Sequence, residues 1–169
     1  MHIADSWSFR RKPSGMFRRV LRIPVYLFLW DLGFLFGDRL VLVTSHGRRS
    51  GRVFQTPVEV VQHDQETHEY VVCSGTGPHA DWFCNLQAES VLEIQLRNRR
   101  WVPRQRFLDN AEAARRFAGY ERDHPGTARR LLSLMANGYD GTEAERVAMM
   151  AKMPMVAFSD SGPERGTPR

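Results

Sequence analysis

Residues 40–57, LVLVTSHGRRSGRVFQTP, constrain the fold of this chain more than any other stretch. Residues 40–45 alternate in an apolar, β-branched pattern that is typical of a buried strand. Gly47 and Gly51 bracket the residues that follow, and glycine permits the positive φ angles of a tight turn. The second half returns as another strand, so the stretch predicts a β-hairpin, and the rest of the chain must extend the sheet that this hairpin begins.

The turn of this hairpin carries Arg48, Arg49 and Ser50 between its two glycines. An arginine presents a fixed fork of donors, and successive backbone amides in a turn form a concave site for an anion. The same residues also suit a solvated hairpin tip whose arginines only maintain solubility. The turn alone leaves both interpretations open.

The remaining pattern predicts an α+β chain in a single domain. The hairpin's second strand continues through residues 58–61, and four further strands are expected at 69–74, 91–96, 100–108 and 153–158. Helices are expected at 16–37, 80–86, 109–120, 125–135 and from 142. The residues from Asp109 to Glu112 resemble a capping box, with Asp in place of the usual Ser or Thr, and the helix from 142 begins with a Thr-x-x-Glu capping box. About six mostly antiparallel strands with helices at both ends indicate a small closed or half-closed barrel at 16–159. Residues 1–15 are expected to form a mobile basic arm, and residues 160–169 a disordered tail.

The charge of the chain points to an anionic partner. Its net charge is +5, its pI is about 9.8, and arginine exceeds lysine. A phosphorylated cofactor, an anionic membrane surface and nucleic acid all suit this charge. Cys73 and Cys84 show no metal or redox spacing and are expected to be reduced, which with the absence of a secretion signal predicts a cytoplasmic protein.

Residues 16–37 combine three arginines with a run of apolar and aromatic residues. The run is too short to span a bilayer, and Asp31 interrupts it. The segment therefore suits either a helix that covers the core or forms a lid, or a helix at a membrane interface. The second interpretation predicts peripheral contact with the inner face of the cell membrane.

Several chemistries lack the sequence pattern that they need. The six histidines have no metal-ligand spacing, so no metal is expected. No nucleophile elbow and no dinucleotide-binding fingerprint are present. Nucleic-acid binding is kept as an alternative, although no partner of this kind is expected. The residues that would form its stacking platform are Arg97, Arg99, Arg100, Arg104 and Arg106 with Trp101 and Phe107.

Three motifs in order carry a resemblance to a known family. They are Gly47-Arg48-Arg49-Ser50-Gly51 followed by Thr56-Pro57, then Val71-Val72-Cys73-Ser74-Gly75, then Asp81-Trp82-Phe83-Cys84-Asn85-Leu86. Together they resemble the deazaflavin-dependent nitroreductase family of split β-barrel flavin and deazaflavin oxidoreductases. The resemblance covers roughly residues 35–108.

The resemblance implies a split β-barrel that binds the 8-hydroxy-5-deazaflavin coenzyme F-420. The turn residues would hold the coenzyme's phosphate or carboxylates, and the loop at 74–77 would approach its flat ring with backbone donors. Trp82 would pack its helix onto the barrel, and Asn85 would bond a neighbouring loop. Many relatives have an arginine at the position of Phe54, so affinity or tail geometry is expected to differ here, with Arg52 or Arg39 as compensating cations. The implied cofactor-binding residues are Arg48, Arg49, Ser50, Gly51, Arg52, Ser74, Gly75 and Gly77.

The activity implied by the resemblance is hydride transfer from the reduced deazaflavin to a quinone, a nitro compound or an activated alkene. Tyr120 and Tyr139 are the candidate proton donors of the acceptor pocket, and each also suits a half-buried place on an amphipathic helix. An FMN-binding split barrel and a cofactor-binding protein without turnover remain alternatives. The physiological substrate and a homodimeric state are left open.

Overall fold

The computed structural model describes residues 33–126, 128–129, 132, 139 and 141–161. The predicted arm at 1–15, residues 16–32 of the predicted N-terminal helix, most of the predicted 125–135 helix and residues 162–169 lie outside the described residues. The described end of the 16–37 segment forms a short 3-10 helix, η1 (Gly33–Phe36).

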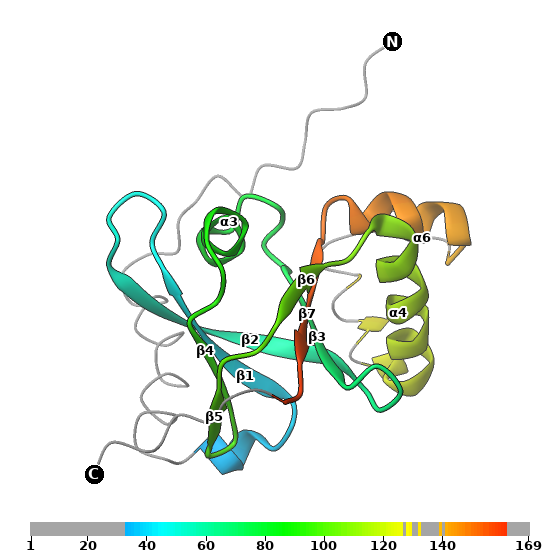
Figure 1. Cartoon of the computed structure of the whole chain (residues 1–169). Helices are drawn as coiled ribbons and strands as arrows, with labels where there is room; N and C mark the ends of the chain where they lie inside the picture. Colours follow the sequence, from blue (N-terminus) through cyan, green and yellow to red (C-terminus); the bar gives the residue numbers. More distant parts are fainter. Residues whose placement is uncertain (1–32, 127, 130–131, 133–138, 140, 162–169) are drawn as a thin grey trace, which may run out of the picture.

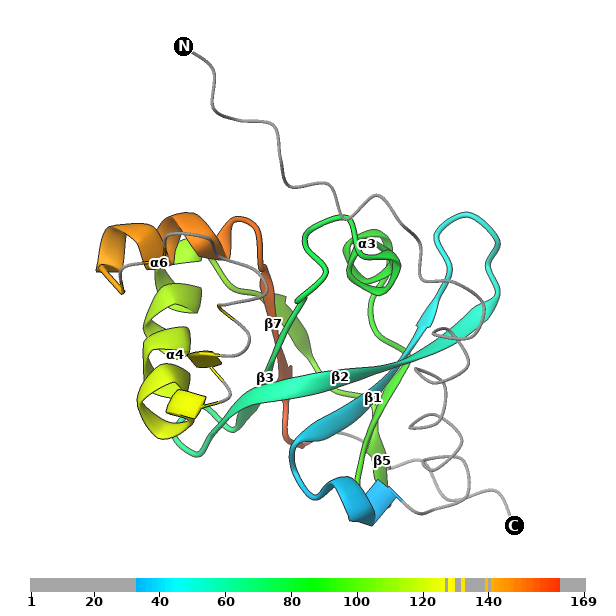
Figure 2. The ribbon, with the colours of Figure 1, turned by 180° about the vertical axis from the view of Figure 1, so that it is seen from behind.

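Seven antiparallel strands form one strongly curled sheet (Figures 1 and 2). Its order is β5-β4-β1-β2-β3-β7-β6, so the predicted hairpin of β1 and β2 lies near its centre. The strands are β1 (Leu40–His46), β2 (Val53–Asp64), β3 (Glu69–Cys73), β4 (Glu93–Leu96), β5 (Arg99–Trp101), β6 (Gln105–Phe107) and β7 (Met155–Ser159).

The seventh strand arises because the predicted strand at 100–108 is divided in two. Pro103 lies in the break, and proline has no N–H to donate to a sheet ladder. Only residues 102–104 separate β5 from β6, yet these strands occupy opposite ends of the sheet order. The chain therefore links the two edges directly. A backbone hydrogen bond from Ser159 N to Arg104 O (2.9 Å) and a hydrogen bond from the Trp101 indole N–H to Ser159 O (2.8 Å) hold this link in place.

The long strand β2 connects the two halves of this curled sheet. It pairs with β1 as far as the pair Leu40–Glu59, and with β3 from the pair Val60–Val72 onward. A bulge between Val60 and Gln62 interrupts the register where β2 changes its partner from β1 to β3. Because a bulge bends and twists its strand, β2 turns from one half to the other, and the sheet forms the predicted α+β split barrel.

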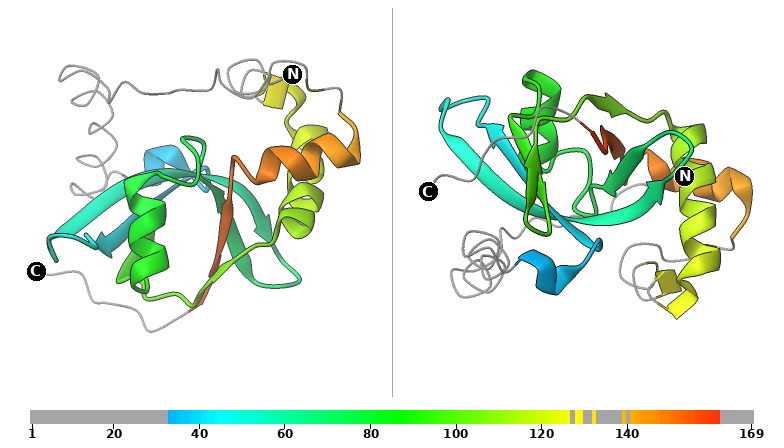
Figure 3. Two further views of the ribbon diagram at one scale, coloured as in Figure 1. Left: turned by 90° about the horizontal axis from the view of Figure 1, so that it is seen from above. Right: turned by 60° about the horizontal axis from the view of Figure 1, so that its bottom comes forward.

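Two apolar clusters lie on the two sides of the sheet. The first fills the barrel and includes Trp101 and Phe158, both 0% exposed. The second lies between the sheet and the C-terminal helices and includes Phe117 and Met150. These helices, α4 (Asn110–Asp123) and α6 (Glu143–Met150), pack against each other beside β3 and β7 (Figure 3).

The helix starts follow from short capping side chains. Asp109 Oδ1 accepts a hydrogen bond from Glu112 N at 2.7 Å, and Thr142 Oγ1 accepts one from Glu145 N at 3.4 Å. Both predicted caps are therefore confirmed. Between β3 and β4, the third helix α3 (Asp81–Ala88) lies across the barrel next to the β1–β2 hairpin (Figure 1). No described helix is long and apolar enough to cross a bilayer.

Gln105 holds the connection from α3 to β4 in place. Its side-chain oxygen accepts a hydrogen bond from Val91 N at 2.8 Å, and its amide nitrogen donates to Leu86 O at 2.9 Å. One side chain from β6 thereby satisfies a backbone carbonyl of the last turn of α3 and a backbone N–H of the loop that follows. This brace fixes α3, and α3 forms one wall of the cavity described next.

Candidate coenzyme and acceptor site

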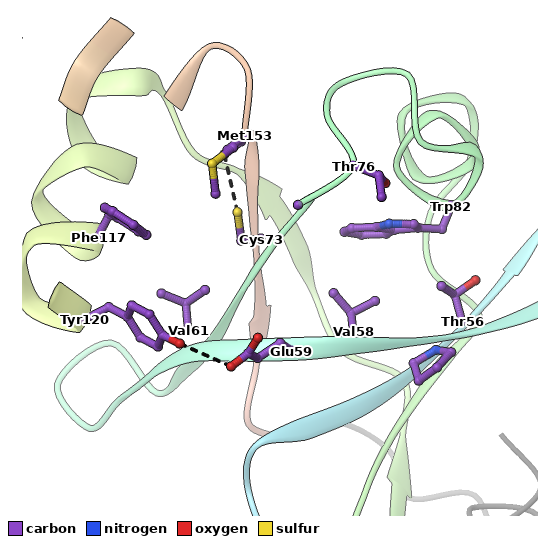
Figure 4. Close-up of a pocket in the computed structure, with 12 residues that line it drawn as sticks. Thr56, Val58, Glu59, Val61, Cys73, Thr76, Trp82, Phe117, Tyr120 and Met153 are labelled. Carbon is purple, nitrogen blue, oxygen red and sulfur yellow. Dashed lines mark hydrogen bonds between the residues drawn. The ribbon is translucent and has the colours of Figure 1, made fainter. Parts of the chain in front are cut away.

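A cavity of about 350 Å³ opens where β2 passes from one half of the barrel to the other (Figure 4). Strand β2, the loop after β3, α3 and α4 form its walls. The lining residues are Thr56, Pro57, Val58, Glu59, Val61, Cys73, Gly75, Thr76, Trp82, Phe117, Tyr120 and Met153.

The walls are mostly apolar, and a large aromatic ring lies on one side. Trp82 extends from α3 over β2 (Figure 4), packs against the barrel cluster and meets the Phe83 ring edge-to-face at 5.9 Å. The predicted packing of Trp82 onto the barrel is confirmed, and the same side chain also lines the cavity. A flat, half-buried indole beside an aliphatic strand suits a flat heteroaromatic ligand.

The loop from Ser74 to Gly77 is built from its own backbone. Ser74 is buried, and its hydroxyl donates to Gly77 O at 2.7 Å, while Gly77 N donates to Ser74 O at 2.9 Å. Gly77 has a φ of +93°, which other residues rarely adopt. Gly75 and Thr76 form part of the cavity wall, whereas the Ser74 hydroxyl shapes the loop from behind.

The β1–β2 turn is closed by backbone bonds, as its two glycines predict. Gly47 N donates to Arg52 O and Gly51 N donates to Gly47 O, both at 2.8 Å, and Gly51 has a φ of +64°. Arg49, Ser50 and Arg52 are exposed on this turn. Strand β2 runs from the turn to Thr56, the first of its residues on the cavity wall, so the turn and the cavity share one strand.

Arg48 is already engaged within the protein. Its guanidinium donates to Asp81 Oδ1 at 3.2 Å and to Asn85 Oδ1 at 3.0 Å, and its backbone N donates to the same Asn85 oxygen at 3.1 Å. The predicted role of Asn85, bonding a neighbouring loop, is confirmed. Arg48 thus docks the turn onto α3, and its predicted contact with an anion stays a prediction.

Arg49 and Arg52 differ from Arg48 in this respect. Within the described part of the chain, neither guanidinium forms a hydrogen bond or an ion pair. Phe54 lies against the turn, since a Cβ placed on Gly47 would lie 2.4 Å from Cε2 of its ring. The aromatic ring therefore covers the base of the turn, and two exposed cations remain at its tip.

The structure brings only one of the two candidate tyrosines to the cavity. Tyr120, on α4, lines it and donates its hydroxyl to Glu59 Oε1 at 3.2 Å (Figure 4). Burial, with the Glu59 carboxylate adding to it, raises the pKa of Tyr120 to about 12. Tyr139 is not on the cavity wall. It packs against the helix cluster, where burial and the nearby Glu121 raise its pKa to about 12.

Sequence reasoning missed two polar groups of the cavity, Glu59 and Cys73. Burial raises the pKa of the Cys73 thiol to about 12, and its Sγ donates to Met153 O at 3.6 Å. Glu59 is a carboxylate within an otherwise apolar strand segment, a signal that was available in the sequence. Because neighbouring side chains of a regular strand point to opposite faces, the sequence offered no reason to place Val58 and Glu59 in one cavity.

The platform required for nucleic-acid stacking is not formed. Trp101 is 0% exposed, and the guanidinium of Arg106 is held by Glu69 and Glu112 at 2.8 Å. Arg97 pairs with Asp38, also at 2.8 Å. Because these arginines neutralise carboxylates of the same chain, they offer little to a phosphate backbone.

The family of the chain follows from comparison with known proteins. A family model described as F420H(2)-dependent quinone reductase matches residues 32–132. The chain belongs to this family. As a member, it is an oxidoreductase that uses coenzyme F-420 as its cofactor and transfers a hydride to an electrophilic acceptor. The matched residues include the turn, the 74–77 loop, α3 and most of the cavity wall.

Solved structures similar to this chain share little sequence identity with it, and similarity at this level concerns the fold alone. One described as a domain-swapped dimer shares 16% identity with a TM-score of 0.50, covering 88% of this chain and 100% of that one. Another, described as an F420-H2 dependent reductase (FDR-A), shares 18% identity with a TM-score of 0.48, covering 73% and 96%. No curated protein gives a significant match.

The residues of the site fit the coenzyme that the family uses. The coenzyme combines a flat ring, a phosphodiester and an acidic tail. The cavity supplies an aromatic and aliphatic enclosure, with a backbone-built loop beside it. The turn supplies two arginines without partners among the described residues. Since apolar walls favour a ring and guanidinium forks favour phosphate, both ends of the coenzyme have a matching surface.

Proposed function

We propose that this protein reduces a quinone-type acceptor in the cavity beside Tyr120, with coenzyme F-420 held between the β1–β2 turn and the cavity. The observation that carries the proposal is the placement of the turn and the cavity on the single strand β2. A ligand that is charged at one end and flat and apolar at the other would be matched at both.

The groups of the turn and of the cavity have separate roles in binding the coenzyme. Arg49, Arg52 and the turn amides would contact the phosphate and carboxylates, while Arg48 keeps the turn against α3. The 74–77 loop and Trp82 would accept the ring. When bound, the reduced coenzyme supplies a hydride, and the apolar walls keep water away from it.

Tyr120 is the proposed proton donor to the acceptor. Its hydroxyl lies on the cavity wall, and its high pKa keeps the phenol protonated throughout the physiological range. A positioned phenol is a suitable general acid for an anion that forms on reduction. For Tyr139 the role of donor stays a prediction, because this residue lies outside the cavity wall.

Binding and turnover test the proposal together. We expect F-420 to bind more tightly than FMN in a fluorescence titration, and higher salt to weaken its binding because the turn contacts are ionic. Arg49→Ala combined with Arg52→Ala should weaken this binding, and Y120F should slow quinone reduction while binding is kept. Y139F is the matched tyrosine variant: because Tyr139 lies outside the cavity wall, turnover is expected to be retained, and loss of turnover would support the donor role predicted for Tyr139. Preference for FMN, or unchanged binding by the double arginine variant, would contradict the proposal.

Peripheral contact with the inner face of the cell membrane is a separate proposal. It is supported by the net charge of +5 and by Leu35, which is 61% exposed at the described end of the 16–37 segment. Such a contact would bring a cytoplasmic enzyme to membrane quinones. Co-sedimentation with anionic vesicles but not with zwitterionic ones is expected, and equal recovery with both would contradict it.

We also propose that the protein assembles as a homodimer. The support is a similar solved structure that is described as a domain-swapped dimer. Light scattering coupled to gel filtration measures the mass directly. A monomeric mass across the accessible concentration range would exclude the dimer.

A further inference from the structure

Among the described residues that line the cavity, Glu59 is the single carboxylate. It lies on β2 at the last residue pair with β1, immediately before the bulge. Its Oε1 accepts the hydrogen bond from the Tyr120 hydroxyl at 3.2 Å, and Figure 4 shows the two side chains approaching each other across the floor of the cavity. The residue itself is exposed.

Few charges surround this carboxylate. Arg39, just before β1, acts on Tyr120 from a distance, and Glu59 forms no ion pair with any described residue. The Cys73 thiol on β3 is kept neutral by its raised pKa. On α4 the neighbours are Tyr120 and His124, whose rings lie 5.1 Å apart. The carboxylate therefore relies on water for much of its stabilisation.

We propose that Glu59 takes up a proton when a ligand fills the cavity and passes this proton through Tyr120 to the reduced acceptor. This inference rests on the proposed function. A ligand in the cavity displaces the water that solvates the carboxylate, and desolvation favours the neutral form of an acid. Without a paired cation to offset that effect, uptake of a proton from solvent is the expected response.

The proton transfers balance in three steps. Reduction by a hydride adds two electrons and one hydrogen to the acceptor and leaves it as an anion. The Tyr120 O–H bond breaks as its proton bonds to that anion, and the resulting phenolate takes the proton from the Glu59 carboxyl. Glu59 returns to its carboxylate form and regains a proton from solvent when the cavity next fills.

The neutral carboxyl also improves Tyr120 as an acid. The Glu59 charge is one of the causes that raise the Tyr120 pKa, after burial. Protonation of Glu59 removes this charge at the moment when the phenol has to release its proton. Glu59 is thus a positioning residue that acts through Tyr120.

The test is the pH dependence of coenzyme binding in the wild type and in Glu59→Gln. Glutamine keeps the shape and an oxygen that accepts from Tyr120, but it does not titrate. Between about pH 5.5 and 7, we expect the ratio of the wild-type Kd to the Kd of the variant to rise about tenfold for each pH unit. Titration of the coenzyme's own groups affects both proteins alike and cancels in this difference.

Matched variants complete the test. Glu66→Gln changes an exposed carboxylate outside the cavity and should keep the wild-type pH slope. Y120F should also keep this slope, because Glu59 still takes up its proton, while reduction of the acceptor is slowed. If Glu59→Gln does not fold, Glu59→Leu replaces it with the same expectation. Equal slopes in the wild type and the Glu59 variant overturn the inference alone, whereas failure of the wild type to bind F-420 refutes the proposed function as well.

Discussion

Arg48 and Arg49 are neighbours in one turn, yet they have different roles in the structure, and this difference can be measured. Arg48→Ala removes the guanidinium bonds to Asp81 and Asn85. Arg49→Ala removes a side chain with no partner among the described residues. The two variants therefore form a matched pair, with the same change of charge at adjacent positions of one loop.

The expected magnitudes follow from exposure. The side chain of Asp81 is 85% exposed, so its ion pair with Arg48 contributes little, about 0.5 kcal/mol. The bond to Asn85 is partly buried and contributes about 1 kcal/mol. The free energy of unfolding of Arg48→Ala should thus fall by about 1.5 kcal/mol, while that of Arg49→Ala should change by less than about 0.5 kcal/mol. Arg49→Ala should also lose one charge-assisted contact with the coenzyme. Such a contact contributes about 1.5–3 kcal/mol to binding, so the Kd for the coenzyme should rise roughly 10- to 100-fold.

Urea unfolding and fluorescence titration of F-420 measure the two quantities on the same preparations. The pattern that supports the assignment is a stability loss confined to Arg48→Ala and a purely binding defect in Arg49→Ala. A binding defect in Arg48→Ala at full stability, larger than that of Arg49→Ala, would refute the reasoning and make Arg48 the direct anion contact.

Two further predictions concern the fold around the cavity. Gln105→Ala removes the donor and the acceptor that satisfy Leu86 O and Val91 N. We therefore expect the free energy of unfolding, measured with urea, to fall by about 2 kcal/mol. A change of less than about 0.5 kcal/mol would show that water replaces these two hydrogen bonds. Because the folded state raises the pKa of Tyr120 from 10.0 to about 12, its contribution to stability is full below about pH 10 and is lost as the pH rises towards 12. Y120F should flatten this part of the stability profile, and an unchanged slope would contradict the burial argument.

Local pattern in the sequence predicted most of the fold. The hairpin at 40–57 and the caps at Asp109 and Thr142 depend on residues close together in the chain. The division of the predicted 100–108 strand was harder to foresee. It depends on Ser159, a distant residue that holds the chain on either side of Pro103 and so links the two sheet edges.

The site was predicted less completely than the fold, for a physical reason. Residue type indicated that the turn could bind an anion, but only the packing of α3 separates Arg48 from Arg49 and Arg52. Amphipathic spacing likewise could not distinguish Tyr120 from Tyr139, since both were expected on helix faces. What separates them is that α4, which carries Tyr120, borders the cavity, whereas Tyr139 lies outside α4 and packs against the helix cluster.

Glu59 shows why strand alternation fails where the cavity lies. In a regular strand Val58 and Glu59 point to opposite faces. Here β2 leaves β1 at Glu59 and joins β3 at Val60, and the bulge that follows bends the strand between the two halves. Residues at both even and odd positions of β2, such as Val58 and Glu59, therefore line the same cavity. The bulge that splits the barrel is therefore also what places a carboxylate in an apolar cavity within hydrogen-bond distance of Tyr120, so fold and proton chemistry have one structural origin.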